Sequence, residues 1–316
     1  MARLGYDEFK EYCMKSVVKV LGEDKYEADP QPFKQTDEIV IDSVRIVEKN
    51  NKTGHFPSFR VRPFYSDYCN GKPLGEVMLH IVKTIEEVLD KPLDLPDPGI
   101  FSAFDAAKDS LIIRPISYAS NKKLLQDHMH KRFGGVAVVL YMLMQQSGES
   151  LMTAKVPRSI TEEWGLDKDF LMRIALENTA RLFPPFILPL EITFQGVEIF
   201  PQIPVSNRFF MDPVIPFELI PSGLHTYYLS VDKGGINGAS AAFYPGVLEK
   251  LASIFNDDLY VSLPCIREAM VHPASKSDVS ALNHGANSLI RTLDPLERLS
   301  PSVYRYSRSD KKFRML

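Results

Sequence analysis

Hydrophobic and polar positions change their spacing twice within the first 92 residues. Apolar side chains recur at helical spacing over residues 6–20, and Gly22 follows where a helix commonly ends, so the pattern predicts a first helix. Residues 38–47 and 56–64 alternate with a period of two around the turn-rich sequence KNNKTG, which predicts a hairpin. A second amphipathic pattern over residues 74–89 stops before Pro92. We therefore expect an N-terminal helix-strand-helix unit.

The middle of the chain predicts a mixed region up to residue 183. A proline-rich hinge at 91–99 precedes a strand pattern at 110–119, and the β-branched run FGGVAVVLYMLM favours a buried strand over a helix. Ser159 or Thr161 can cap a short helix that extends to Trp164. Asp167 can cap the longer helix that follows.

The segment from residue 184 to 221 carries eight prolines. This density is incompatible with a regular helix or strand of any length, so we predict a linker or an ordered arm over residues 184–223. Its apolar stretches, EITFQGVEIF and FFMDPVIPFELI, indicate that the arm packs on the protein or on a partner.

The C-terminal part alternates strand and helix patterns. A strand at 225–231 leads through a glycine-rich turn to a helix that starts at Pro245, then to the strand DLYVSLPC, a helix over 279–293 and a final hairpin in VYRYSRSDKKFRM. The predicted fold class is therefore α+β. We expect an N-terminal α+β region (1–183), the Pro-rich arm (184–223) and a C-terminal α+β region (224–316).

The composition is that of a folded globular protein. Hydrophobic residues at 45% and charged residues at 24% are typical of a folded globular chain. A net charge of −3 gives no general electrostatic reason to bind nucleic acid or an anionic membrane. The three cysteines form no CxxC pair, and neither a signal-peptide pattern nor an apolar run of about 18 residues occurs. We expect a cytoplasmic protein without membrane association.

Three motifs suggest chemistry, and each has a plainer explanation. His128 and His130 could share a metal only on a strand or loop, and they have no third ligand at an obvious spacing. The sequence GGING at 234–238 has glycine spacing that suits phosphate but lacks the lysine of a P-loop, so a turn explains it. Cys265 has His272 nearby, although a buried structural cysteine is the simpler interpretation. The sequence predicts no metal and no cofactor.

Asn178 interrupts an apolar helical stripe. A buried amide without partners would cost about 1–3 kcal/mol, so we expect it to hydrogen-bond the backbone of the turn that begins at Phe183. The alternative is a ligand pocket formed by Asn178 and Arg181 with His130 or Arg132.

The C-terminal tail is locally basic. Two tyrosines interleave with its cations, an arrangement that could contact the phosphates and bases of a nucleic acid. A hairpin at a sheet edge would show the same charges, because edge charges discourage pairing with other chains. The candidate nucleic-acid contacts are Arg305, Arg308, Lys311, Lys312 and Arg314.

Several segments together resemble a large bacterial family that is known only as a domain of unknown function and is frequent in anaerobic Gram-positive gut bacteria. The matching segments are YDEFKEYC, FYSDYCNG, NKKLLQDHMHKRFGGVAVVLYML, ITEEWGLDKDFLMRIALENTARLFPP, NGASAAFYPGVLEKLASIFNDDLYVSLPCIREAMV and VYRYSR. The resemblance implies a bacterial cytoplasmic protein and supplies no catalytic residue. A more distant resemblance to another uncharacterised bacterial family places a Pro-His pair where Pro264 and Cys265 stand, which disfavours a shared catalytic role there.

These observations favour a non-enzymatic binding or adaptor protein with an unidentified protein partner. A competing hypothesis is a small-ligand sensor or enzyme that uses the pocket near Asn178 and Arg181. A third is a nucleic-acid-associated factor, in defence or mobile-element biology, that acts through the basic tail.

Overall fold

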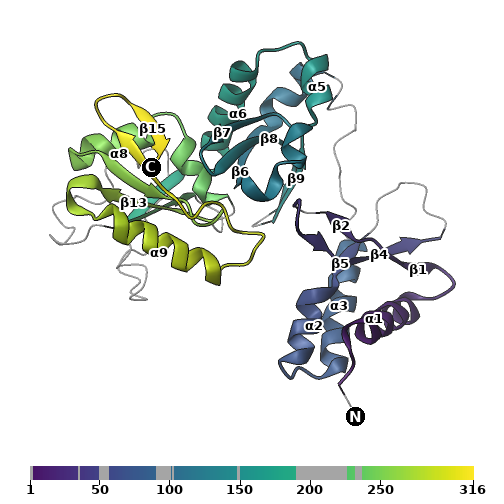
Figure 1. The fold of residues 1–316 in the computed structure, drawn as a ribbon. Coiled ribbons are helices and arrows are strands. Elements are labelled where there is room, and N and C mark those ends of the chain that lie inside the picture. Colours follow the sequence, from purple (N-terminus) through teal and green to yellow (C-terminus); the bar gives the residue numbers. More distant parts are fainter. Residues whose placement is uncertain are drawn as a thin grey trace. The chain divides into compact units, whose positions relative to one another are not determined.

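The computed structural model describes residues 3–34, 36–49, 57–89, 101, 103–147, 150–189, 226–231 and 237–316. The chain forms two compact units, residues 1–94 and 95–316, which are drawn in purple to blue and in teal to yellow (Figure 1). The units divide in the proline-rich hinge, whereas the predicted regions divide at the Pro-rich arm. The fold class is α+β, as predicted, because helices accompany sheets whose described strand pairs are all antiparallel.

The first unit contains the predicted helix-strand-helix arrangement. Its sheet has the order β1-β4-β5, and β2 pairs with β3 beside it. Helix α1 ends at Gly22, whose φ of 108° suits glycine, and it buries Phe9, Cys13 and Val17 in the core of the unit. The elements are α1 (Tyr6–Leu21), β1 (Tyr26–Pro30), β2 (Phe33–Lys34), β3 (Val40–Ile41), β4 (Ser43–Glu48), β5 (Ser58–Arg60), α2 (Val61–Cys69) and α3 (Leu74–Leu89).

The predicted hairpin in this unit is right in its pairing and wrong in its extent. Strand β4 pairs with β5 as expected, but β5 ends at Arg60 and the chain turns at once into helix α2. Pro63 falls in the first turn of that helix, where a missing backbone N–H costs no helical hydrogen bond. The alternating pattern of residues 61–64 was therefore misleading.

The second unit begins with a four-stranded sheet. Strand β8 lies at its centre, β6 pairs along one side, and β7 and β9 share the other side. Asp167 caps α6 as predicted, because its carboxylate accepts from the backbone N–H of Phe170 at 3.0 Å. The predicted cap at Ser159 or Thr161 is wrong, since both lie inside α5. The elements are α4 (Phe104–Ala107), η2 (Lys108–Ser110), β6 (Leu111–Ser117), η3 (Ala119–Asn121), η4 (Leu124–Gln126), β7 (His130–Phe133), β8 (Val136–Ser147), β9 (Ser150–Lys155), α5 (Arg158–Glu163) and α6 (Lys168–Leu182).

A six-stranded sheet of order β10-β11-β13-β12-β14-β15 completes the second unit. Strand β10 is formed by Pro185–Pro189, so the expectation that no regular element could form in this proline-rich segment was wrong. Prolines are tolerated here because β10 is an edge strand. Residues 190–225, which include most of the predicted arm, and residues 232–236, which include the first three residues of GGING, lie outside the described residues. The other elements are β11 (Tyr227–Val231), η7 (Gly238–Phe243), α8 (Val247–Phe255), β12 (Leu259–Ser262), β13 (Ala269–Pro273), η8 (Ala274–Lys276), α9 (Val279–Thr292), β14 (Val303–Ser307) and β15 (Lys312–Met315).

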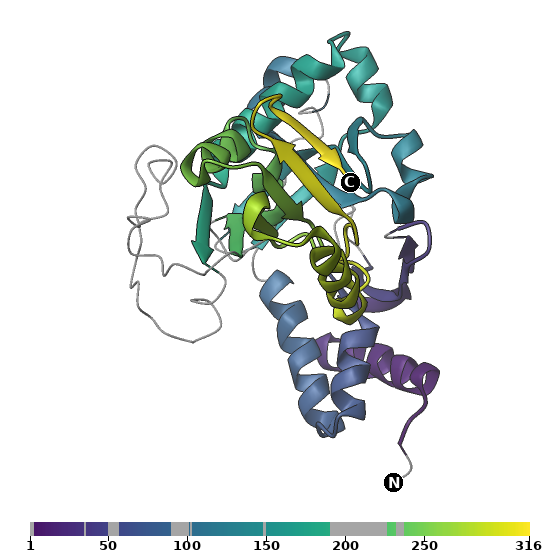
Figure 2. The same cartoon turned by 60° about the vertical axis from the view of Figure 1, so that its left-hand side comes forward.

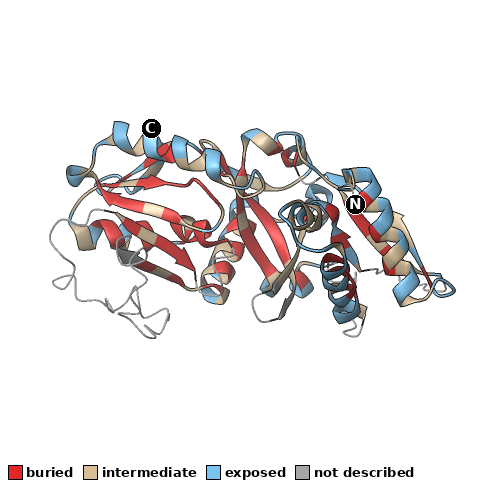
Figure 3. Ribbon diagram, turned by 90° about the horizontal axis from the view of Figure 1, so that it is seen from below, coloured by how far each residue is buried: buried red, intermediate tan, exposed pale blue. Residues whose placement is uncertain are grey.

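The two sheets of the second unit share a hydrophobic core. Ile112, Val139 and Tyr141 on one face of the four-stranded sheet join the inner face of the six-stranded sheet, while the opposite face packs against α6. The strands are accordingly largely buried (Figure 3). The C-terminal hairpin, β14 and β15, lies beside the segment formed by η7 and α8 (Figures 1 and 2).

Candidate functional site

Asn178 fixes helix α6 to the start of strand β6. Its side-chain nitrogen donates to the carbonyl oxygens of Lys108 at 2.7 Å and Leu111 at 3.1 Å, and its side-chain oxygen accepts from Arg181 at 3.4 Å. The expected partners in the turn at Phe183 are therefore wrong. In that turn, the carbonyl oxygen of Phe183 instead accepts a hydrogen bond of 3.2 Å from the hydroxyl of Tyr244.

Thr179, the next residue of α6, also forms a hydrogen bond with the backbone of strand β6. Its hydroxyl accepts from the backbone N–H of Ile113 at 2.9 Å, on the side of β6 that faces away from β8. Pro115, two residues further on the same edge, has no N–H to offer. Helix α6 and Pro115 together occupy an edge that would otherwise be open to pairing with another chain.

His130 and Arg132 lie elsewhere on the sheet. His130 is opposite Val139 and Arg132 is opposite Ala137, several residues along β8 from the position that pairs with Leu111. The guanidinium of Arg132 donates to Gly134 O at 2.9 Å and lies 3.8 Å from the Tyr118 ring centroid. In the described residues, no hydrogen bond or ion pair joins His130 or Arg132 to Asn178 or Arg181.

The other chemical motifs have ordinary environments. The ring nitrogen Nδ1 of His128 is hydrogen-bonded to the Leu124 carbonyl oxygen at 2.8 Å. No group of three metal-ligating side chains occurs within the part of the chain that the structure describes. Burial, and secondarily the charge of Glu268, raises the pKa of the buried Cys265 thiol to about 12. A thiol that stays protonated at neutral pH is a poor nucleophile.

The basic tail forms the predicted hairpin, and three of its five candidate cations bind acidic or amide side chains. Arg305 donates twice to Asp258, and Lys311 forms an ion pair of 2.6 Å with Glu249. Arg308 donates to Asn256 at 2.6 Å. The remaining two, Lys312 and Arg314, are exposed on the edge strand β15.

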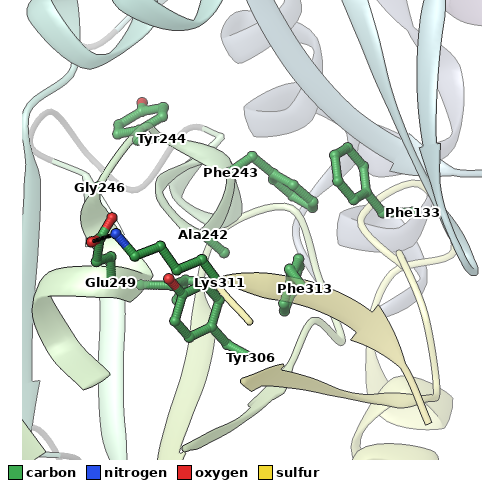
Figure 4. Close-up of a pocket in the computed structure, with 10 residues that line it drawn as sticks. Phe133, Ala242, Phe243, Tyr244, Gly246, Glu249, Tyr306, Lys311 and Phe313 are labelled. Atoms are coloured by element: carbon green, nitrogen blue, oxygen red, sulfur yellow. Dashed lines mark ion pairs between the residues drawn. The ribbon is translucent and has the colours of Figure 1, made fainter. Parts of the chain in front are cut away.

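A small pocket adjoins this hairpin, and we call it the aromatic pocket. It has a volume of about 230 Å³, and three phenylalanine rings form one side of it (Figure 4). The ring centroids of Phe133 and Phe243 are 5.0 Å apart, and that of Phe313 lies 6.3 Å and 6.0 Å from them. The lining residues are Phe133, Ala242, Phe243, Tyr244, Gly246, Leu248, Glu249, Tyr306, Lys311 and Phe313.

Tyr304 of strand β14 holds the turn that follows Phe133. Its buried hydroxyl accepts from the backbone N–H of Gly135 at 3.1 Å and lies 3.2 Å from the Phe133 carbonyl oxygen, to which it can donate. A side chain at Gly135 would place its Cβ 2.6 Å from the Ser300 hydroxyl oxygen, so only glycine allows this approach. The β7–β8 turn is thereby held against strand β14.

The two charged side chains of the aromatic pocket form an ion pair with each other, and its two phenol groups stay protonated. The side chain of Lys311 extends to Glu249 (Figure 4), and its hydrogen bond to this carboxylate raises the pKa of the Lys311 ammonium group. Burial, then the charge of Glu249, raises the pKa of Tyr306. Burial also raises the pKa of Tyr244, although its hydrogen bond with Ser240 partly opposes the effect. Both phenols therefore remain neutral at physiological pH.

The sequence pattern alone does not reveal this pocket. The predicted hairpin could have paired Tyr306 with Phe313, which are indeed opposite each other. Nothing in the sequence pattern places Phe133 and Phe243 beside them, because they come from another sheet and from a short 3₁₀ helix.

Comparisons with known proteins give a family without an assigned activity. Neither a curated protein nor a solved structure matches the chain. In the described part of the chain, no helix has the length and apolar character needed to cross a membrane. The model of a family of unknown function (DUF5688) matches residues 6–308. The chain therefore belongs to this family.

Proposed function

We propose that the protein is a non-enzymatic binding module that acts in the bacterial cytoplasm, and that the aromatic pocket receives an apolar side chain of a protein partner. The observation that carries this proposal is the pocket itself: aromatic rings form one side, and the Lys311–Glu249 ion pair is part of its lining. Aromatic residues are enriched at protein interfaces, and the residues that contribute most of the binding energy fill pockets of the partner.

The size of the pocket favours a side chain over a whole small molecule. Pockets for drug-sized ligands measure about 300–1,000 Å³. The aromatic pocket, at about 230 Å³, is smaller than this range and suits one large apolar side chain. A peptide or protein surface can insert such an anchor while the rest of its contact lies on the rim.

The chemistry of the lining residues favours binding over catalysis. The only two charged residues among them, Glu249 and Lys311, neutralise each other. The raised pKa values of Tyr244 and Tyr306 keep both phenols in their neutral form, which is unsuited to act as a general base at physiological pH. The nucleic-acid hypothesis has less support, because Arg305, Arg308 and Lys311 already bind side chains of this chain.

A selection from a random-peptide display library on the immobilised full chain tests the proposal. We expect enriched peptides to share an aromatic or large aliphatic residue. They should not be recovered on the variant Phe313→Ala, which removes one ring of the pocket. Failure to enrich any peptide, or equal recovery on both proteins, would contradict the proposal.

A further inference from the structure

A second group of polar side chains lies on the face of the four-stranded sheet that turns toward the six-stranded sheet. Arg114 of β6 is at its centre: Nε donates to Asn237 Oδ1 at 2.9 Å, and Nη1 donates to Thr153 Oγ1 at 2.9 Å. The guanidinium carbon lies 5.1 Å from the ring centroid of Tyr141. These contacts hold Arg114 in place through neutral acceptors.

Lys155 of β9 brings a second positive charge to the same face. It lies directly opposite Tyr141 in the strand pairing, next to the ring that Arg114 contacts. Burial and, secondarily, the charge of Arg114 lower the pKa of the Lys155 ammonium group. The two cations are therefore close enough to repel each other.

The ion pairs found between the described residues include neither Arg114 nor Lys155. Two partly buried cations that face neutral groups are unfavourable, because burial removes water and the charges oppose each other. An anion between them would reverse both effects. Arg114 retains unused N–H donors on Nη2, and the ammonium of Lys155 has three donors.

We propose that Arg114 and Lys155, with the hydroxyls of Thr153 and Tyr141, form a binding site for an oxyanion, the phosphate or carboxylate group of a small molecule. A guanidinium fork beside an ammonium group is well suited to either group, and the hydroxyls add neutral donors. The site shares no residue with the aromatic pocket. Its existence therefore does not depend on the proposed partner-binding function.

Thermal unfolding of the full chain in inorganic phosphate, in acetate and in chloride at matched ionic strength tests the site. An anion that binds only the folded protein raises the melting temperature, and the rise saturates with its concentration. We expect phosphate or acetate to produce such a rise above that in chloride, and the more effective anion identifies the group that the site accepts.

The variant Lys155→Met keeps the length and apolar stem of the side chain and removes the charge. It should weaken the apparent affinity at least about tenfold, because it removes a charge-assisted hydrogen bond to the anion. Lys276→Met, at an exposed lysine of η8, is the matched control and should behave as the wild type. Arg114→Gln should also lose the effect, but it removes structural hydrogen bonds, so the lysine variant is decisive.

A second measurement follows the charge of Lys155 directly. The pKa of its ammonium group, measured by NMR of the ε-methylene carbon, should rise when the effective anion is added. No anion-specific change in melting temperature would overturn the proposal. So would the same rise in Lys155→Met as in the wild type, or an unchanged Lys155 pKa at saturating anion.

Discussion

The side-chain amide of Asn178 donates to the carbonyl oxygen of Leu111 across 3.1 Å and so joins helix α6 to the outer edge of strand β6. The neighbouring Thr179 hydroxyl accepts from Ile113 N–H on the same edge. A helix that packs on a sheet face would need only apolar residues. Here α6 also covers a strand edge, and two polar side chains satisfy the backbone groups that the edge leaves open.

Replacing Asn178 by leucine should destabilise the fold. The change leaves two carbonyl oxygens, those of Lys108 and Leu111, without their donor, at a cost of about 1–3 kcal/mol in the free energy of unfolding. Urea denaturation measures this loss. Arg181→Ala is the control, because the exposed Arg181 makes a contact of 3.4 Å and its loss should change stability by less than about 0.5 kcal/mol. Equal losses in both variants would contradict the structural role of Asn178.

Thr179→Val should be destabilising, and Thr179→Ser should be close to wild type. Valine has nearly the shape of threonine but leaves the buried N–H of Ile113 unpaired, which costs about 1–3 kcal/mol. Serine keeps the hydroxyl and loses only a methyl group. Chemical denaturation of the two variants separates the hydrogen bond from packing, and a serine variant as unstable as the valine variant would count against the edge-covering role.

Tyr304→Phe should weaken the attachment of the C-terminal hairpin to the β7–β8 turn. The phenylalanine keeps the ring and removes the hydroxyl that accepts from Gly135 N–H, so we expect a loss of about 1–3 kcal/mol. Backbone amide exchange at Gly135 should accelerate in parallel. Tyr306→Phe is the control on the same strand, since no hydrogen bond of its hydroxyl to another described residue is found. A similar loss in the control would argue against the hydroxyl as the cause.

Local features of the fold were predictable from the sequence. The end of α1 at Gly22, the cap of α6 by Asp167 and the final hairpin all depend on residues close together in the chain. The sequence pattern does not predict helix α2, because the first residues of this helix alternate as those of a strand do. Pro63 is nevertheless compatible with a first helical turn.

Features that depend on distant residues were not predictable. Asn178 stands out in the sequence as a polar residue in an apolar stripe, but its partner Leu111 lies 67 positions away in the sequence. The aromatic pocket gathers Phe133, Phe243 and Phe313 from three separate stretches. A single-sequence periodicity identifies which face of each element is apolar, and it does not show which elements meet.

The cysteines should differ sharply in reactivity. Burial raises the thiol pKa of Cys13 to about 12, and burial with the charge of Glu268 does the same for Cys265, whereas Cys69 is only half-buried. A thiol reagent at pH 8 should therefore label Cys69 first and the other two only after unfolding. The folded Cys69→Ser variant should show no fast-reacting thiol. Rapid labelling of Cys265 in the folded protein would contradict the burial of its thiol and reopen a chemical role for it.

Asp258 should contribute stability above about pH 4 and lose that contribution in acid. The backbone N–H of Arg308, and then the guanidinium of Arg305, lower the pKa of Asp258. A carboxyl group whose pKa is lower in the folded state stabilises the fold above its ordinary pKa, about 4, and the effect disappears as the pH falls through the folded-state value. The stability difference between wild type and Asp258→Asn should be below about 1 kcal/mol near neutrality and shrink below pH 4. A difference that grows in acid would have the wrong sign.

The direct test of the central claim is the affinity of a display-selected peptide for matched variants of the full chain. Phe313→Ala should weaken binding at least about tenfold, because a buried aromatic anchor commonly contributes 2 kcal/mol or more. Phe33→Ala, at an exposed phenylalanine of β2 in the other unit, should bind as the wild type does. Peptide addition should also shift the methyl NMR signals of Ala242 and Leu248, which line the pocket. Equal affinity for both variants with unmoved methyl signals would show that the aromatic pocket is not the contact surface.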